Sequence, residues 1–313
     1  MSVTIHTRGL TKHFGRIAAL NCVDLNVEEG SIYALVGANG AGKTTFIKLL
    51  MNILPPTGGD ATVLGFPALR LEGKQFNRIG YVSENQEMPD WMTVAEWMEY
   101  WRPFYPQWDI ELERQLVAQF DLPLKRRLKD LSRGMRMKAA FASSLAYRPA
   151  LIVLDEPFSG LDPLVRDELI EGLLDRASES TILLSSHDLA EIESFASHVG
   201  YLADGQMLFS EEMTALSNRF RDVTVTLDGP ASLPANTPPD WLQFQVNGAV
   251  VHFVHSGYAG EASESAIRAA FPTARSVSVD PMPLRSIFLA IAKNERRHPP
   301  NAATTLQPGR SVA

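Results

Sequence analysis

Short, wholly apolar runs alternate with helical patterns over about the first 220 residues of the chain. Three of these runs are each followed directly by polar residues: Ile32–Val36, Leu151–Leu154 and Thr181–Leu184. Runs of this length predict strands that are buried on both faces of a parallel sheet. The alternation with helices therefore predicts an α/β fold. Because ligands of such sheets bind beyond the carboxyl ends of the strands, we expect the three polar segments to meet at one edge.

Residues 87–148 have a different pattern, in which helical periodicity dominates and no clear strand is present. This stretch contains four of the five tryptophans of the chain, namely Trp91, Trp97, Trp101 and Trp108. We interpret it as a helical subdomain inserted into the α/β core that spans residues 1–220. We expect Trp97 and Trp101 in the core of the insertion, and Trp91 and Trp108 near a groove.

A smaller unit is predicted to begin at about residue 221. Two alternating segments meet at Asn247-Gly248, a strong hairpin signal. The other expected elements are a strand at Asp222–Leu227, a proline-rich loop at Pro230–Pro239, a helix at Ser263–Phe271, a strand at Ser276–Val279 and a helix at Pro283–Lys293. These elements predict a small α+β domain over residues 221–296. Residues 297–313 are polar and are expected to form a disordered tail.

Composition narrows the classes of protein to consider. The 313 residues contain 45% hydrophobic and 21% charged residues, as in globular proteins. No apolar stretch is long enough to span a membrane, and the sequence shows no signal peptide. The formal charge of −7 argues against nucleic acid as a partner. The single cysteine, Cys22, excludes an internal disulfide framework, and its apolar neighbours predict a core position.

A glycine-rich segment follows the first buried strand. Its spacing, Gly-x4-Gly-Lys-Thr from Gly37 to Thr44, is that of a phosphate-binding loop. The predicted nucleotide-binding residues are Gly37, Ala38, Asn39, Gly40, Ala41, Gly42, Lys43, Thr44 and Thr45. The glycines let backbone N–H groups surround phosphate, Lys43 adds positive charge, and Thr44 offers a hydroxyl to Mg²⁺. The next helix, with Phe46, Leu49, Leu50 and Ile53 on its apolar face, points its positive end at the phosphates.

Two consecutive carboxylates end the strand at Leu151–Leu154. A carboxylate such as Asp155 is costly to bury without a partner, and a hydrated Mg²⁺ is the expected partner beside a phosphate loop. The next residue, Glu156, should point elsewhere, toward the position of an attacking water. Glu156 is therefore our candidate general base.

At these motifs the chain resembles the nucleotide-binding subunits of ABC transporters, over about residues 3–220. Their signature, usually Leu-Ser-Gly-Gly-Gln, here reads Leu131-Ser-Arg-Gly-Met135. The resemblance implies a P-loop NTPase core of ABC type with a mostly parallel sheet. It also implies that Ser132 and Gly134 contact ATP held by a second ATP-binding subunit, an identical copy or a paralogue. Arg133 and Met135 depart from the family pattern. Ser132 is also a good helix cap, and the two roles are compatible.

The resemblance assigns further roles, one residue at a time. Asp162 matches the loop that links the two ATP sites, although it also precedes Pro163 as a typical helix cap. His187 matches the histidine that senses the γ-phosphate and counts with Glu156 and Lys43 as catalytic. Phe14 matches the aromatic residue that stacks on adenine. Glu84 stands where the family usually has a glutamine that contacts Mg²⁺.

The resulting function is that of an Mg-ATP-hydrolysing subunit that dimerises head-to-tail and drives export. The insertion and the small C-terminal unit resemble those of bacterial ABC-2-type exporters, which implies a separate transmembrane permease. The chain would then lie at the cytoplasmic face of the inner membrane, held through that permease. Two alternatives stay open: a soluble ABC ATPase that acts on nucleic acid or ribosomes, and a regulatory subunit that binds nucleotide with little turnover.

Overall fold

The computed structural model describes residues 2–230, 234 and 237–297 of the chain. It divides the chain into two compact units, Met1–Met213 and Thr214–Ala313. The division falls within α7 (Met213–Arg219), ahead of the predicted boundary at residue 220. Each unit has its own hydrophobic core, so each is described separately.

A six-stranded sheet forms the centre of the first unit, in the order β10-β9-β3-β8-β7-β6. All neighbours except β10 and β9 pair in parallel, which confirms the predicted α/β class with a mostly parallel sheet. Every residue of β3, β7 and β8 is buried, as expected for strands covered on both faces. The strands are β3 (Ile32–Val36), β6 (Ile79–Ser83), β7 (Leu151–Asp155), β8 (Thr181–Ser186), β9 (His198–Ala203) and β10 (Gln206–Glu212).

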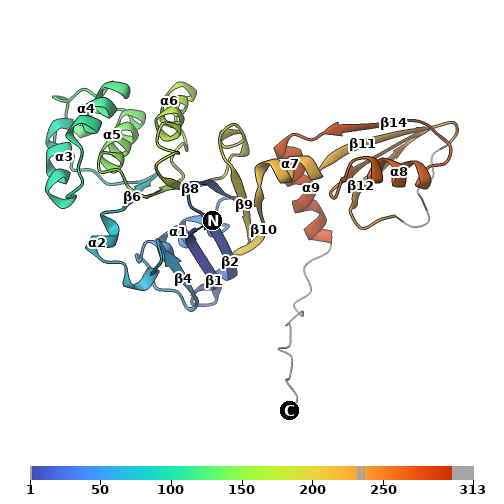
Figure 1. Ribbon diagram of the computed structural model, residues 1–313, viewed down its shortest axis with the longest axis horizontal. Helices are drawn as coiled ribbons and strands as arrows, with labels where there is room; N and C mark the ends of the chain where they lie inside the picture. Colours follow the sequence, from blue (N-terminus) through green and yellow to red (C-terminus); the bar gives the residue numbers. More distant parts are fainter. Residues whose placement is uncertain (1, 231–233, 235–236, 298–313) are drawn as a thin grey trace, which may run out of the picture. The chain divides into compact units, whose positions relative to one another are not determined.

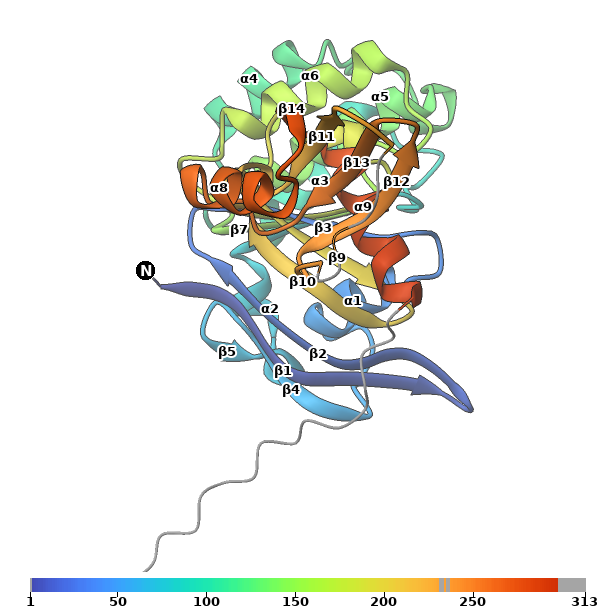
Figure 2. The same cartoon turned by 90° about the vertical axis from the view of Figure 1, so that its right-hand side faces the viewer.

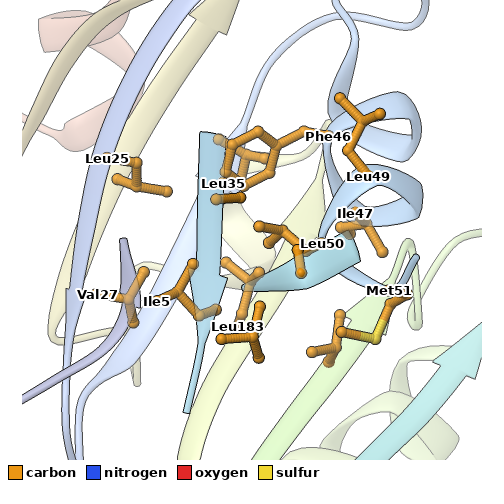
Figure 3. Packing of buried hydrophobic residues seen from close by; sticks show 14 of the residues in the cluster. Ile5, Leu25, Val27, Leu35, Phe46, Ile47, Leu49, Leu50, Met51 and Leu183 are labelled. Carbon is orange, nitrogen blue, oxygen red and sulfur yellow. The ribbon is translucent and has the colours of Figure 1, made fainter. Parts of the chain in front are cut away.

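An antiparallel sheet in the order β2-β1-β4-β5 completes the first unit (Figures 1 and 2). Its strands are β1 (Val3–Phe14), β2 (Ile17–Glu28), β4 (Gly58–Val63) and β5 (Phe66–Pro67). Figure 3 shows Ile5, Leu25 and Val27 of this sheet in one cluster with residues of α1 (Lys43–Leu50) and of the parallel strands. This shared core fixes α1, and with it the phosphate loop, against the carboxyl ends of β3 and β7.

Four helices of the first unit gather apart from the antiparallel sheet (Figures 1 and 2). They are α3 (Val94–Trp101), α4 (Ile110–Gln119), α5 (Arg133–Leu145) and α6 (Pro163–Leu174), whereas the short α2 (Gly73–Phe76) precedes β6. The unit also contains 3₁₀ turns at Ala68–Arg70, Arg102–Phe104, Leu128–Asp130 and Leu189–Glu191. A capping box of Thr93 and Glu96 starts α3. Trp97 is buried as predicted, and its indole nitrogen donates to the Ser143 hydroxyl at 3.1 Å.

The other tryptophans of the insertion are less deeply buried than Trp97, and Trp91 is 68% exposed. Trp101 packs edge-on against Trp97, with ring centroids 5.2 Å apart, and also lines a cavity of about 330 Å³ together with Tyr105 and Tyr147. Trp108 donates to the Glu113 carboxylate at 2.7 Å and does not line that cavity. Helical periodicity alone does not separate these positions, because Trp97 and Trp101 lie on the same face of α3, and only the neighbouring elements decide which ring is covered.

The second unit is an antiparallel sheet in the order β12-β13-β11-β14. Its strands are β11 (Arg221–Leu227), β12 (Trp241–Asn247), β13 (Val250–His255) and β14 (Ala274–Pro281), and its helices include α8 (Glu261–Ala270) and α9 (Leu284–Arg297). The predicted hairpin is present at Gly248, where φ is 61°. The rings of Trp241 and Phe253 stack in the core with centroids 4.6 Å apart. The end of α9 includes the first residue of the predicted tail; residues 298–313 lie outside the described part.

Two predictions about single residues were wrong. Cys22 is exposed, because it has a φ of 52° in a stretch of β2 where the pairing with β1 shifts register and the alternation of faces is interrupted. Ile53 does not extend the apolar face of α1 and is 52% exposed. The helix ends at Leu50, and Asn52 with its φ of 54° turns the chain away.

Candidate functional site

The phosphate loop connects β3 to α1, as predicted. Ala38, Asn39 and Gly40 are exposed at its tip, whereas Gly37 and Ala41 are buried. Gly42 has a φ of 109°, and a Cβ there would lie 2.5 Å from the backbone oxygen of Ala19. Only glycine fits this position, since any side chain would clash with the neighbouring backbone. The loop is thus held tightly where it enters α1 and is exposed at its tip.

Lys43 lies inside this loop with 5% of its side chain exposed. Its ammonium donates to the backbone oxygens of Gly37 at 2.6 Å and Ala38 at 3.2 Å. It also forms an ion pair with Glu156, with Nζ and Oε1 3.0 Å apart. A phosphate placed in the loop would compete with Glu156 for this ammonium, because both are anions.

Asp155 ends β7 beside the first residues of α1. Its Oδ1 accepts hydrogen bonds from the hydroxyls of Thr44 at 3.1 Å and Ser185 at 2.8 Å. Burial is the main cause that raises the pKa of the Asp155 carboxyl, and the two hydroxyls partly oppose it. A cation would stabilise the charged form of this desolvated group. The carboxylate and hydroxyl oxygens of Asp155 and Thr44 are ligands of the kind that Mg²⁺ prefers, so the residues fit this metal.

Glu156 points away from Asp155, as the sequence indicated. The backbone of Glu156 is left-handed, with a φ of 52°, which is uncommon for a residue with a side chain. This turn at the strand end carries its carboxylate to Lys43 and to His187, whose Nδ1 lies 2.7 Å from Oε2. The Ser185 hydroxyl accepts the backbone N–H of Glu156 at 2.9 Å while donating to Asp155. Ser185, to which the sequence analysis gave no role, therefore links the two acidic residues.

The contact between His187 and Glu156 predicts a pH-dependent contribution to stability. The hydrogen bond to Glu156 is the main cause that raises the pKa of His187 above its usual value. A raised pKa means that the stabilisation is complete below about pH 6.5 and is lost as the pH rises through the folded-state pKa. The advantage of the wild type over His187→Gln in unfolding free energy should thus be larger at pH 6 than at pH 9, by about 0.5 kcal/mol or less, because the ring is 40% exposed and solvent screens the pair.

Denaturant unfolding at the two pH values measures this difference. His6→Gln is the matched control, because the His6 ring contacts the amide oxygen of Asn26 instead of a carboxylate. An equal advantage of the wild type over His187→Gln at both pH values would contradict a charged pair.

The signature residues are held by their own helix. The Ser132 hydroxyl accepts the backbone N–H of Met135 at 3.2 Å and caps α5. A Cβ on Gly134 would lie 2.9 Å from Val165, so the glycine allows α6 to pack closely. Asp162 caps α6 through the N–H of Leu164 at 2.9 Å. Ser132 and Asp162 therefore both act as helix caps. Helix α5 lies among the helices of the first unit, whereas α1 lies by the sheets (Figures 1 and 2).

Two further candidates lie outside the cluster of Lys43 and Glu156. The Phe14 side chain is 47% exposed at the end of β1, with the Lys12 ammonium 5.1 Å from its ring centroid. The Phe14 ring is therefore not part of the hydrophobic core. The backbone N–H of Glu84 donates to the Asp155 carbonyl at 2.9 Å, but its carboxylate accepts from Arg133 at 2.8 Å.

Known proteins resemble the chain over about two thirds of its length. The family described as ABC transporter matches residues 20–159. Three curated relatives are the lantibiotic transport ATP-binding protein SrtF of Streptococcus pyogenes (31% identity, 67% of this chain and 92% of the relative), the bacitracin transport ATP-binding protein BcrA of Enterococcus faecalis (30%, 72% and 74%) and an uncharacterised ABC transporter ATP-binding protein of Synechocystis (32%, 68% and 62%).

The solved structures give the same picture. An ATP-binding subunit of an ABC transporter superposes with a TM-score of 0.63 at 26% identity, over 68% of this chain and 91% of that one. A dimeric ATP-binding cassette in a post-hydrolysis state with ADP and Pi superposes with a TM-score of 0.59 at 23% identity, over 67% and 98%. The second of these shows the shared fold.

The chain belongs to the ATP-binding subunits of ABC transporters. It is therefore an ABC-type ATPase. The match extends over 62% of the length of the Synechocystis relative. Within the described residues, no helix is both long enough and apolar enough to cross a membrane.

Proposed function

We propose that two cassettes bind head-to-tail around two Mg-ATP molecules and hydrolyse them to drive export by a separate membrane subunit. The proposal rests on the observation that the residues expected to bind ATP lie in two separate places in the subunit. Lys43, Asp155 and Glu156 converge at one sheet edge, whereas Ser132 caps α5 in the helical part. A head-to-tail pair would bring the capped, electropositive start of α5 in one copy to the phosphates held by the other.

The chemistry follows from the residues at the sheet edge. The phosphate loop and Lys43 would bind the phosphates, and Phe14 offers an exposed ring for the adenine. Thr44 and Asp155 would hold Mg²⁺, with Glu84 beside them, and the metal would neutralise charge on the phosphates. Once Lys43 is engaged by phosphate, Glu156 is free to accept a proton from water, and His187 orients its carboxylate through Nδ1. Asp162, at the start of α6, would communicate with the opposite site.

The export step needs a membrane partner. The relatives SrtF and BcrA are named for lantibiotic and bacitracin transport, which supports a peptide antibiotic as the transported molecule. We propose an ABC-2-type permease as the membrane partner. The cavity lined by Trp101, Tyr105 and Tyr147 is a candidate for the seat of a permease segment, since aromatic side chains are common anchors. The protein would then lie at the cytoplasmic face of the inner membrane, attached through the permease. Its negative charge supports a partner other than nucleic acid.

A mixing experiment tests the divided site. Lys43→Ala disables the phosphate loop but keeps the signature, and Ser132→Phe does the reverse. Each variant alone should lack ATPase activity, and their mixture should regain it, because a mixed pair contains one site with both parts intact. A mixture that stays inactive, while each variant remains folded by circular dichroism, would contradict the head-to-tail arrangement.

A further inference from the structure

The two residues that depart most in charge from the family pattern form an ion pair with each other. Glu84 stands where the family usually has glutamine, and Arg133 stands where it usually has glycine. The guanidinium Nη2 of Arg133 donates to Oε1 of Glu84 at 2.8 Å, although 49 positions separate them in the chain. Their sequence motifs gave no sign of this contact.

This pair connects the metal side of the site to the signature helix of the same subunit. Glu84 follows β6, and its N–H is bonded to the carbonyl of Asp155, so its backbone is fixed next to the Asp155 carboxylate. Arg133 is the first residue of α5, directly after the cap Ser132. A Cβ on Gly160 would lie 3.1 Å from Nη1 of Arg133, so the loop before α6 also borders the guanidinium.

The contact between Arg133 and Glu84 is weak enough for Arg133 to exchange it for another anion. Half of the Arg133 side chain and a third of the Glu84 side chain are exposed, and exposed pairs contribute little because water and salt screen them. A guanidinium binds a phosphate through charge-assisted hydrogen bonds, which are stronger than those to a screened carboxylate. The neighbouring Arg136 is already engaged, with Asp90 at 2.8 Å and the Leu128 carbonyl at 2.9 Å.

We propose that Arg133 is a phosphate-binding residue that changes partner during the cycle. In the nucleotide-free subunit Glu84 holds it, and in the head-to-tail pair it leaves Glu84 for the terminal phosphate of the ATP bound by the facing copy. Glu84 then faces its own metal site without a competing cation. This inference rests on the head-to-tail function proposed above and adds a side chain that the family signature does not supply.

We test the exchange of partners by measuring the dissociation constant of the ATP-dependent dimer, by light scattering in Mg-ATP. The parent protein carries Glu156→Gln, which prevents turnover. Three variants of this parent are compared with it: Glu84→Gln, Arg133→Gln and the double variant with both changes. Arg133→Gln should weaken the dimer by about tenfold or more, through loss of a charged contact to phosphate. Glu84→Gln should tighten it by up to about threefold, because Arg133 is no longer held back, and only while Arg133 is present.

The matched control is the exposed pair of Arg114 and Glu111 on α4, with 3.3 Å between Nη1 and Oε2. The same set of glutamine variants there should leave the dimer unchanged. An unaltered dimer in Arg133→Gln, or the same effect of Glu84→Gln with and without Arg133, would overturn the exchange. Failure of the parent Glu156→Gln protein to dimerise would instead overturn the head-to-tail function and the inference with it. Thermal unfolding without nucleotide checks that every variant is folded.

Discussion

Glu156→Gln is expected to lower the ATP turnover of the protein by about 10²- to 10⁴-fold, the usual contribution of a general base. Glutamine keeps the size of the side chain but cannot accept the proton of an attacking water. It also removes the charge that pairs with Lys43 and His187, so Lys43 is no longer shared with a competing anion. ATP binding should therefore persist or tighten while phosphate release, measured in steady state, nearly stops.

Glu191→Gln is the matched control for this prediction. Glu191 is a partly buried carboxylate near the same sheet edge, but it accepts from the Ser186 hydroxyl and does not contact Lys43. Its variant should retain turnover. Near-zero turnover in the wild type as well as in Glu156→Gln, with ATP binding intact in both, would contradict catalysis and favour the regulatory subunit that binds nucleotide without using it.

Lys43→Ala is expected to weaken ATP binding by about 10- to 100-fold, the value of a charge-assisted contact to phosphate. The variant removes the ammonium at the centre of the phosphate loop, where it already spans the carbonyls of Gly37 and Ala38. Calorimetric titration with Mg-ATP measures the loss. Lys74→Ala, which changes an exposed lysine of α2, should bind as the wild type does. An affinity in Lys43→Ala equal to that of the wild type would remove Lys43 from the site.

The same variant should also lower the stability of the nucleotide-free protein. Glu156 is 11% exposed, and loss of Lys43 leaves its carboxylate with His187 as its ion-pair partner among the described contacts. Breaking one side of a buried pair is costly because the other charge stays desolvated. Adding Glu156→Gln to Lys43→Ala should thus restore part of the unfolding free energy. A double variant that is less stable than Lys43→Ala alone would show that the pair is not the cause.

The sequence by itself determined the family, the class of fold and the position of the phosphate site. The spacing from Gly37 to Thr44 and the polar ends of three apolar strands are local features, and parallel strands necessarily present their carboxyl ends at one edge. Alternation along a strand predicted that the side chains of Asp155 and Glu156 point in different directions, and the two carboxylates do contact different partners.

Only the tertiary structure decided which side chains share a partner. The pairs of Lys43 with Glu156 and of Glu84 with Arg133 join residues far apart in the chain, and no periodicity encodes such a distance. Glu156 and Cys22 each have a left-handed backbone, with a φ of 52°. The surrounding sheet imposes this conformation. The pattern of the chain therefore placed the elements, whereas packing between them set the ion pairs and the exposure of individual residues.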